Sequence, residues 1–375
     1  MAGLYIHIPF CAGRCTYCDF FSQTEIKYKV PYLQAVVREL ELRKAYLQGE
    51  PIETIYFGGG TPSQLQAADF ERIFEAIHRY YNTSACHEIT MEANPDDLTP
   101  EFLSTLKRLP FNRISLGVQS FRDEDLRMLN RRHDGQQAVE AVRLCQEKGY
   151  ENLSLDLIYG LPGQTPERWE ENLDKAIQLN IPHLSAYHLT YEEGTVIRRQ
   201  LENGTVRPVD EDTSVLFFYT LIYRLTSAGY LHYELSNFGK PGRFSRHNTA
   251  YWTGRKYIGI GAAAHSYDQV SRQWNIASIP EYIRAIACET PAFEKEMLDL
   301  RTRYNDYVMT RLRTMWGIRL SSLRDMFGQE LYSYFLRQAR LHIRNDVLQE
   351  TDETIRFTLR GAFISDGILS DLMSV

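Results

Sequence analysis

Apolar and polar positions along the first half of the chain follow two alternating periods, which predicts repeated strand–helix units. Short runs rich in β-branched and aromatic residues predict strands, and the segments between them have the spacing of an amphipathic helical face. The predicted strands cover residues 4–9, 53–57, 87–91, 113–118, 153–158 and 183–189. The predicted helices cover residues 32–48, 65–80, 100–109, 136–148 and 165–180.

This repetition favours parallel strands joined by helical crossovers. Six units predict an α/β protein built on an incomplete TIM-like (β/α)6 barrel rather than the closed barrel of eight units. Functional residues of such barrels gather beyond the carboxyl ends of the strands. A cysteine-containing loop, a run of glycines, Glu92 and Gln119 follow the first four predicted strands in turn, and Asp156 lies within the fifth. We therefore expect these groups to meet at one end of the barrel.

The pattern changes after about residue 200, which predicts three parts. Residues 1–200 form the partial barrel, and residues 201–291 form an aromatic-rich segment that caps it, beginning with a helix over 215–228. Residues 292–375 are charged and helical and end in short strands near 354–358. This last part is expected to be a small winged-helix-like α+β domain.

Composition places the chain among ordinary globular proteins. Of its 375 residues, 43% are hydrophobic and 24% charged. The net charge of −6 argues against a nucleic-acid partner. The first residues lack the basic and apolar regions of a secretory signal, and no apolar run is long enough to span a bilayer. These observations predict a cytoplasmic protein.

Three cysteines near the start, Cys11, Cys15 and Cys18, form a C-x₃-C-x₂-C cluster. Three thiolates at this spacing can hold three irons of a cubic [4Fe–4S] cluster and leave the fourth iron open for a small molecule. The alternative is a structural zinc site completed by a histidine such as His7. Clustered free thiols also indicate a reducing compartment. The remaining cysteines occur singly and are expected to be buried apolar residues: Cys86, Cys145 and Cys288.

Several polar groups at strand ends suit a small zwitterionic ligand. The run Gly58–Gly60 lacks the lysine of a phosphate loop, so it either lets a ligand approach the backbone or forms a tight turn. Glu92 and Asp156 can accept hydrogen bonds from ribose hydroxyls or an amino group, and Arg131 can pair with a carboxylate. Together these groups outline a site for a zwitterionic nucleoside.

Two later motifs have competing interpretations. The run Gly259–Ala264 matches a loose G-x-G-x-x-A pattern, but no amphipathic helix follows, so a dinucleotide site is not predicted. His247 stands close to Tyr251 and Trp252, and imidazole is a common axial ligand of haem iron. The alternative for His247 is a hydrogen-bonded structural histidine.

The motifs of this chain, and their order along it, resemble those of the radical S-adenosylmethionine (SAM) superfamily, in its coproporphyrinogen-oxidase-like branch. The resemblance extends over nearly the whole chain, from the segment 5–11 through the cysteines to the segments 92–95, 115–120, 129–131 and 155–162. It implies a [4Fe–4S] cluster on the three cysteines, with SAM bound to the open iron. The residues matching SAM contacts of the family are Tyr5, Tyr17, Gly59, Gly60, Thr61, Glu92, Gln119, Arg131 and Asp156.

Two families of this branch differ in sequence. The oxygen-independent coproporphyrinogen III dehydrogenases have a longer N-terminal extension and a further cysteine where this chain has Phe20. The haem-chaperone family has a short N-terminus and a His-Asn-x-x-Tyr-Trp motif, which matches His247–Trp252 here. Resemblance to the chaperones implies that the chain binds haem, with His247 as a candidate ligand, and passes it to apo-haemoproteins.

The resemblance further implies a low-potential electron donor such as flavodoxin or ferredoxin. It leaves open a homodimer and peripheral membrane association through the acceptors. Two other functions compete with haem delivery. One is radical oxidative decarboxylation of coproporphyrinogen III, and the other is a SAM-binding scaffold whose cluster only stabilises the fold.

Overall fold

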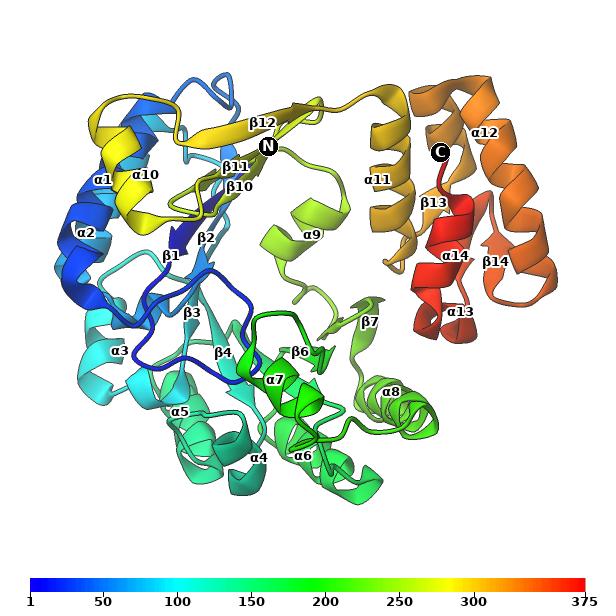
Figure 1. Cartoon of the computed structure of the whole chain (residues 1–375), viewed down its shortest axis with the longest axis horizontal. Helices are drawn as coiled ribbons and strands as arrows, with labels where there is room; N and C mark the ends of the chain where they lie inside the picture. Colours follow the sequence, from blue (N-terminus) through cyan, green and yellow to red (C-terminus); the bar gives the residue numbers. More distant parts are fainter. Residues whose placement is uncertain (375) are drawn as a thin grey trace.

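The computed structural model describes residues 1–374, and its centre is a curved sheet with six parallel strands. Neighbouring strands pair in parallel throughout this series. The α/β partial barrel predicted from the sequence is thus confirmed (Figure 1). The six strands are β1 (Ala2–Ile8), β2 (Ile52–Gly59), β3 (Glu88–Ala93), β4 (Arg113–Gln119), β5 (Leu153–Tyr159) and β6 (His183–His188).

Helices between the strands cover the outside of this sheet, as Figure 1 shows. The apolar faces of most of these helices and the outward side chains of the strands make one large core, while Ile197, after β6, packs in a separate small cluster. The helices are α1 (Lys29–Leu42), α2 (Ala67–Tyr80), α3 (Pro100–Leu106), α4 (Asp123–Met128), α5 (Gly135–Glu147), α6 (Pro166–Gln178), α7 (Val196–Glu202) and α8 (Glu211–Ser227).

The helix predicted over residues 32–48 was too long at its end, because α1 stops at Leu42. The chain continues in turns, with Gln48 and Gly49 at φ of 53° and 77°. Left-handed backbone of this kind cannot continue a right-handed helix. Leu47 is still buried, so the prediction that it is a core residue is correct, whereas the prediction that it is helical is wrong.

Short strands extend the sheet at both edges. Two of them pair antiparallel beyond β6, and four others continue the sheet beyond β1. The segment 201–291, predicted to cap the barrel, therefore supplies all but the last of these edge strands. The added strands are β7 (Leu231–Glu234), β8 (Asn237–Gly239), β9 (Tyr257–Ile260), β10 (His265–Tyr267), β11 (Ser271–Asn275) and β12 (Phe293–Met297), with α9 (Arg246–Trp252) and α10 (Ile279–Ala287) between them.

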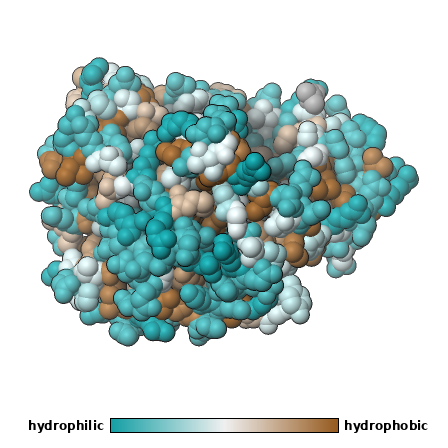
Figure 2. Space-filling view, turned by 60° about the horizontal axis from the view of Figure 1, so that its bottom comes forward, coloured by the Kyte–Doolittle hydropathy of each residue, from teal (hydrophilic) through white to brown (hydrophobic). Residues whose placement is uncertain are grey.

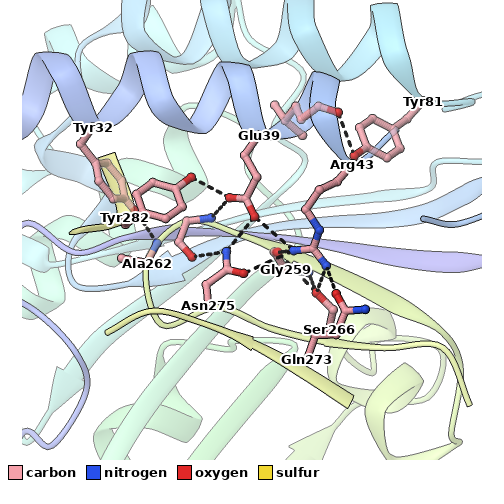
Figure 3. Close-up of polar contacts among 12 residues, drawn as sticks. Tyr32, Glu39, Arg43, Tyr81, Gly259, Ala262, Ser266, Gln273, Asn275 and Tyr282 are labelled. Atoms are coloured by element: carbon pink, nitrogen blue, oxygen red, sulfur yellow. Dashed lines mark hydrogen bonds and ion pairs between the residues drawn. The ribbon is translucent and has the colours of Figure 1, made fainter. Parts of the chain in front are cut away.

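A buried polar network attaches the strands beyond β1 to helix α1 (Figure 3). Glu39 on α1 and Arg43, which follows the last residue of that helix, form an ion pair of 3.1 Å, and both side chains are buried. Arg43 donates to Ser266 at 3.0 Å, and Glu39 accepts from Asn275 at 2.7 Å and from Tyr282 at 2.6 Å. A buried pair with its remaining atoms hydrogen-bonded in this way fixes one arrangement of the edge strands.

The C-terminal part has a separate small core. Helix α12 breaks at Gly328, whose φ of 80° and ψ of 175° are not helical. The order of helix, strand, broken helix and two strands is compatible with a winged-helix-like domain, which stays a prediction. The elements are α11 (Leu300–Leu312), β13 (Ile318–Arg319), α12 (Leu320–Arg344), β14 (Leu348–Thr351), β15 (Thr354–Phe357), α13 (Leu359–Phe363) and α14 (Ser365–Leu372).

The surface is mostly hydrophilic on the face drawn in Figure 2, with apolar residues in small groups. This mixture is ordinary for a protein exposed to water. Within residues 1–374, every helix is too short or too polar to cross a lipid bilayer.

Candidate functional site

A cavity of about 410 Å³ opens at the carboxyl ends of the parallel strands. The structure brings all of the predicted site residues to this cavity except Tyr5 and His247. The cavity is lined by residues of the cysteine loop after β1 and by residues of the next five strands or the loops after them, as expected for a barrel of this kind. The predicted residues lining the cavity are Cys11, Cys15, Tyr17, Cys18, Gly59, Gly60, Thr61, Glu92, Gln119, Arg131 and Asp156.

The cysteine loop is held against the barrel by hydrogen bonds to two of its sulfurs. Thr61 Oγ1 donates to Cys11 Sγ at 3.4 Å, and Arg131 Nη1 donates to Cys15 Sγ at 3.4 Å. Burial raises the pKa of the Cys18 thiol to about 11 and also raises the pKa of the Cys11 thiol. Thiols with a raised pKa keep their protons at neutral pH. They lose these protons when they bind a metal centre, because its positive charge stabilises the thiolates.

A single zinc ion completed by His7 was the alternative to a cluster on this loop. Within residues 1–374, no three side chains of histidine, cysteine, aspartate or glutamate are grouped to share one metal ion. In a [4Fe–4S] cluster each cysteine binds a different iron, so the sulfurs need not converge on one point. Both ring nitrogens of His7, the residue considered as a zinc ligand, are already hydrogen-bonded. Nδ1 is bonded to the Tyr5 hydroxyl at 3.0 Å and Nε2 to the Phe21 carbonyl at 2.9 Å.

The glycines at the end of β2 and directly after it are required by close packing. Gly59 has a φ of 108°, and a Cβ atom there would overlap the ring of His7. A Cβ on Gly60 would lie 2.7 Å from the carbonyl oxygen of Ile8. The run therefore forms a tight turn against β1, and the same absence of side chains leaves backbone facing the cavity.

Two partly buried carboxylates, Glu92 and Asp156, lie inside the barrel below the cysteine loop. Glu92 accepts from Tyr56 at 2.7 Å and from the Gly59 amide at 3.1 Å, while Asp156 accepts from Ser115 at 3.4 Å. Burial raises the pKa of Glu92 to about 7, and the negative charge of Asp156 adds to the shift. Burial raises the pKa of Asp156 as well. A cationic ligand group would favour the ionised form of both carboxylates.

Arg131 connects the cluster loop to the barrel. Besides Cys15, its guanidinium donates to Asn94 Oδ1 at 2.6 Å and to the carbonyl of Gly117. Gln119 follows on the same strand with a φ of 69°, which is an uncommon conformation for a residue with a side chain. Backbone strain of this kind is typical of positions that are held for binding.

Rows of polar residues inside the barrel were not predicted from the sequence. Arg113 and Ser115 on β4, Ser154 on β5, and His183 and Ser185 on β6 are all buried. They stand at every second position of their strands, and alternate residues of a strand face the same side. Barrel interiors are usually filled by branched apolar residues. A period-two polar pattern in otherwise apolar strands was the available signal.

His247 lies outside the cavity, at the start of α9. Its Nδ1 is hydrogen-bonded to Thr54 at 2.8 Å and its Nε2 to Tyr251 at 2.8 Å. Burial lowers the pKa of His247 to about 3, so the ring is neutral. This is the hydrogen-bonded structural state that the sequence left open. Tyr5, expected at the SAM site, lines a second cavity instead, and both binding roles stay predictions.

Fold and site together define the class of protein. A partial barrel carries three cysteines on its first loop, and residues 5–176 match the model of the radical SAM superfamily. Residues 298–364 match the HemN C-terminal domain. The structure of coproporphyrinogen III oxidase (HemN), a radical SAM enzyme from Escherichia coli, aligns with a TM-score of 0.86 over 100% of this chain and 90% of that chain. At 22% identity it establishes the shared fold.

Curated relatives narrow the class to one family. The chain is 32% identical to heme chaperone HemW of Lactococcus lactis, over 98% of this chain and 96% of the relative. Identity to the HemW of Bacillus subtilis is 31%, over 98% of each chain. Identity to the HemW of Escherichia coli is 42%, over 70% of this chain and 69% of the relative. The chain belongs to the HemW family of the radical SAM superfamily.

Proposed function

We propose that this chain is a haem chaperone, which binds haem and passes it to apo-haemoproteins. The observation that carries the proposal is its similarity, over nearly its full length, to proteins named heme chaperone HemW. Phe20 supports the same conclusion, because the dehydrogenase branch is expected to have a cysteine there. The side chain of Phe20 is exposed and lines the cavity beside the cysteine loop, where it can contact a ligand.

We further propose that Cys11, Cys15 and Cys18 hold a [4Fe–4S] cluster and that the 410 Å³ cavity holds SAM. When bound, the cluster would supply an iron with an open coordination position. Glu92 and Asp156 offer acceptors for cationic or hydroxyl groups of SAM. Arg131 holds the loop through Cys15 and adds positive charge near the thiolates.

The proposed setting is the cytoplasm, because the described cysteines are all free and three of them are grouped in one loop. A low-potential donor such as flavodoxin or ferredoxin would reduce the cluster. The acceptors would be apo-haemoproteins, including membrane-bound ones reached from the surface of the bilayer. A homodimer fits the same proposal.

The experiment that tests this function separates haem delivery from enzyme activity. The full chain is reconstituted anaerobically with iron and sulfide, titrated with haem, and mixed with an apo-haemoprotein. We expect a shifted Soret band on haem binding, followed by appearance of the acceptor's own haem spectrum. Cys15→Ser should lower the iron bound per chain, whereas Cys145→Ser, at a buried position far from the loop in sequence, should not.

The outcomes distinguish the three functions. A parallel assay supplies coproporphyrinogen III, SAM and a reductant to the reconstituted chain. Formation of protoporphyrinogen would contradict the chaperone function and support the dehydrogenase. SAM binding without haem binding or turnover would support the scaffold.

A further inference from the structure

A second cavity, of about 920 Å³, lies between the edge of the barrel sheet and the C-terminal part. Its walls come from the later part of β1, the end of the cysteine loop, strands β9–β11, and helices α9, α11 and α12. In Figure 1 helix α11 is the C-terminal element nearest the barrel. The volume is at the upper end of the range of about 300–1,000 Å³ typical of sites for small molecules and cofactors. Neither the proposed cluster nor SAM accounts for it.

Aromatic side chains supply much of the lining. Tyr251 and Tyr257 pack edge to face with their centroids 4.6 Å apart, and Tyr267 lies 6.1 Å from Tyr257. Tyr307 and Phe327 face them from the C-terminal part, with centroids 5.3 Å apart. Aromatic walls contributed from two sides suit a large flat ligand with apolar faces.

Positive charge is available at the same cavity. Arg303, Arg311 and Arg272 line it. Arg272 is already paired with Asp306 at 2.8 Å, and Arg311 donates to the Thr253 carbonyl at 3.0 Å. The guanidinium of Arg303 has no hydrogen bond or ion pair with any other residue among 1–374. An unpaired guanidinium at an aromatic cavity offers a partner for a carboxylate ligand.

His265 provides a free imidazole in this cavity. It stands on β10, and its side chain is exposed, with no hydrogen bond from either ring nitrogen to another of the described residues. Although the side chain is exposed, partial desolvation of the ring, together with the charge of Arg272, lowers the pKa of His265, which favours the neutral form that binds iron. The other histidine of the cavity, His7, has both nitrogens engaged, as does His247 nearby.

The fold holds His265 in this orientation. Its neighbour Ser266 is buried and accepts from Arg43 at 3.0 Å in the network of Figure 3. Adjacent residues of a strand point to opposite faces, so His265 and Tyr267 both face the cavity while Ser266 faces α1. Pairing of His265 with Trp274 on β11 fixes the register.

We propose that haem binds in this second cavity, with His265 as a ligand of its iron and Arg303 and Arg311 beside its propionates. The inference rests on the proposed haem-chaperone function and names the place of the cargo within it. A haem there would lie beside the cluster loop, because Asp19 and Phe20 line both cavities. His247 would then act as a structural residue that supports α9.

The test titrates the full, cluster-reconstituted chain with haem and records the Soret band and the spin state of the iron. We expect His265→Ala to lose the histidine-ligated spectrum and to bind haem roughly tenfold more weakly, a difference of about 1.4 kcal/mol. Added imidazole should restore the spectrum by entering the space left by the side chain. His87→Ala is the matched control, since His87 is exposed and lines neither cavity.

A second arm tests the propionate contact. Haem dimethyl ester lacks the carboxylates, so the wild-type chain should bind it more weakly than haem. Arg303→Gln should weaken binding of haem but leave binding of the ester unchanged. Equal losses for both ligands would contradict the contact with Arg303.

The outcomes separate this inference from the proposed function. If the wild-type chain binds haem and His265→Ala has an unchanged spectrum and affinity, the inference is wrong while the function stands. Loss of the histidine spectrum in His247→Ala alone would move the ligand to α9 and also overturn the inference. A wild-type chain that binds no haem would contradict the proposed function itself.

Discussion

The ring of Tyr56 stacks on the ring of His247, with centroids 5.0 Å apart and planes 23° from parallel. The hydroxyl of the same tyrosine donates to Glu92 at 2.7 Å. Tyr56 therefore links the His-Asn-x-x-Tyr-Trp motif on α9 to a carboxylate of the proposed SAM site. This contact offers a physical reason for the motif that does not require His247 to touch haem.

The affinity for SAM should depend on pH through Glu92. The pKa of Glu92 is about 7 in the ligand-free chain, and a cationic ligand favours the ionised carboxylate. Affinity should therefore rise by up to about tenfold per pH unit below 7 and level off above it. Glu92→Gln should remove this component of the profile. Calorimetric titration of both proteins from pH 5.5 to 8.5 measures it, and parallel profiles would show that Glu92 does not contact the ligand.

Glu234 should make the stability of the chain fall as pH rises. Burial raises the pKa of this glutamate from 4.5 to about 7, so the folded state binds its proton more tightly than the unfolded state does. Its stabilising contribution is full below pH 4.5 and is lost as pH rises through 7. In Glu234→Gln the unfolding free energy should fall less between low and high pH than in the wild type, by about 1–3 kcal/mol.

Urea denaturation at pH 5 and pH 8 measures that difference. Glu71→Gln is the control, because Glu71 is exposed on α2. A Glu234→Gln variant with the same pH dependence as the wild type would contradict the prediction.

Gly59→Ala should destabilise the chain more than a substitution at another left-handed glycine. At Gly59 the new methyl group would meet the ring of His7, in addition to the unfavourable φ of 108°. Gly163 also has a positive φ, of 72°, but a Cβ there meets nothing within 4 Å. Gly163→Ala should cost about 1–2 kcal/mol for the backbone alone, and Gly59→Ala clearly more. Equal melting temperatures for the two variants would exclude the steric contribution.

The network between α1 and the edge strands should be strongly non-additive. Glu39→Ala leaves Arg43 buried without its ion-pair partner, which is expected to cost about 3–5 kcal/mol. Replacing both residues by leucine should cost less than the sum of the two single changes. The exposed pair Arg38–Glu41 is the control, and Glu41→Ala should change the unfolding free energy by about 1 kcal/mol or less. Denaturant unfolding of the set gives the coupling energy.

Much of the barrel could be predicted because its signals are local. Each of the six parallel strands is present close to its expected position, since strands and helices differ in the period of their apolar residues. The meeting of the cysteines with Glu92, Gln119 and Asp156 followed from topology, because the carboxyl ends of parallel strands lie at one edge. The inward row of polar residues was missed, although its period of two was visible in strands such as Arg113–Gln119.

The amino-acid sequence by itself determined the repeated units, the cysteine spacing and the set of residues at the strand ends. Only the tertiary structure decided where His247, Tyr5 and His265 lie relative to the two cavities. Short strands such as β10 carry too few residues for a periodic signal, and their pairing depends on partners distant in sequence. Whether an imidazole is free or hydrogen-bonded depends on those partners too, as the contrast between His265 and His247 demonstrates.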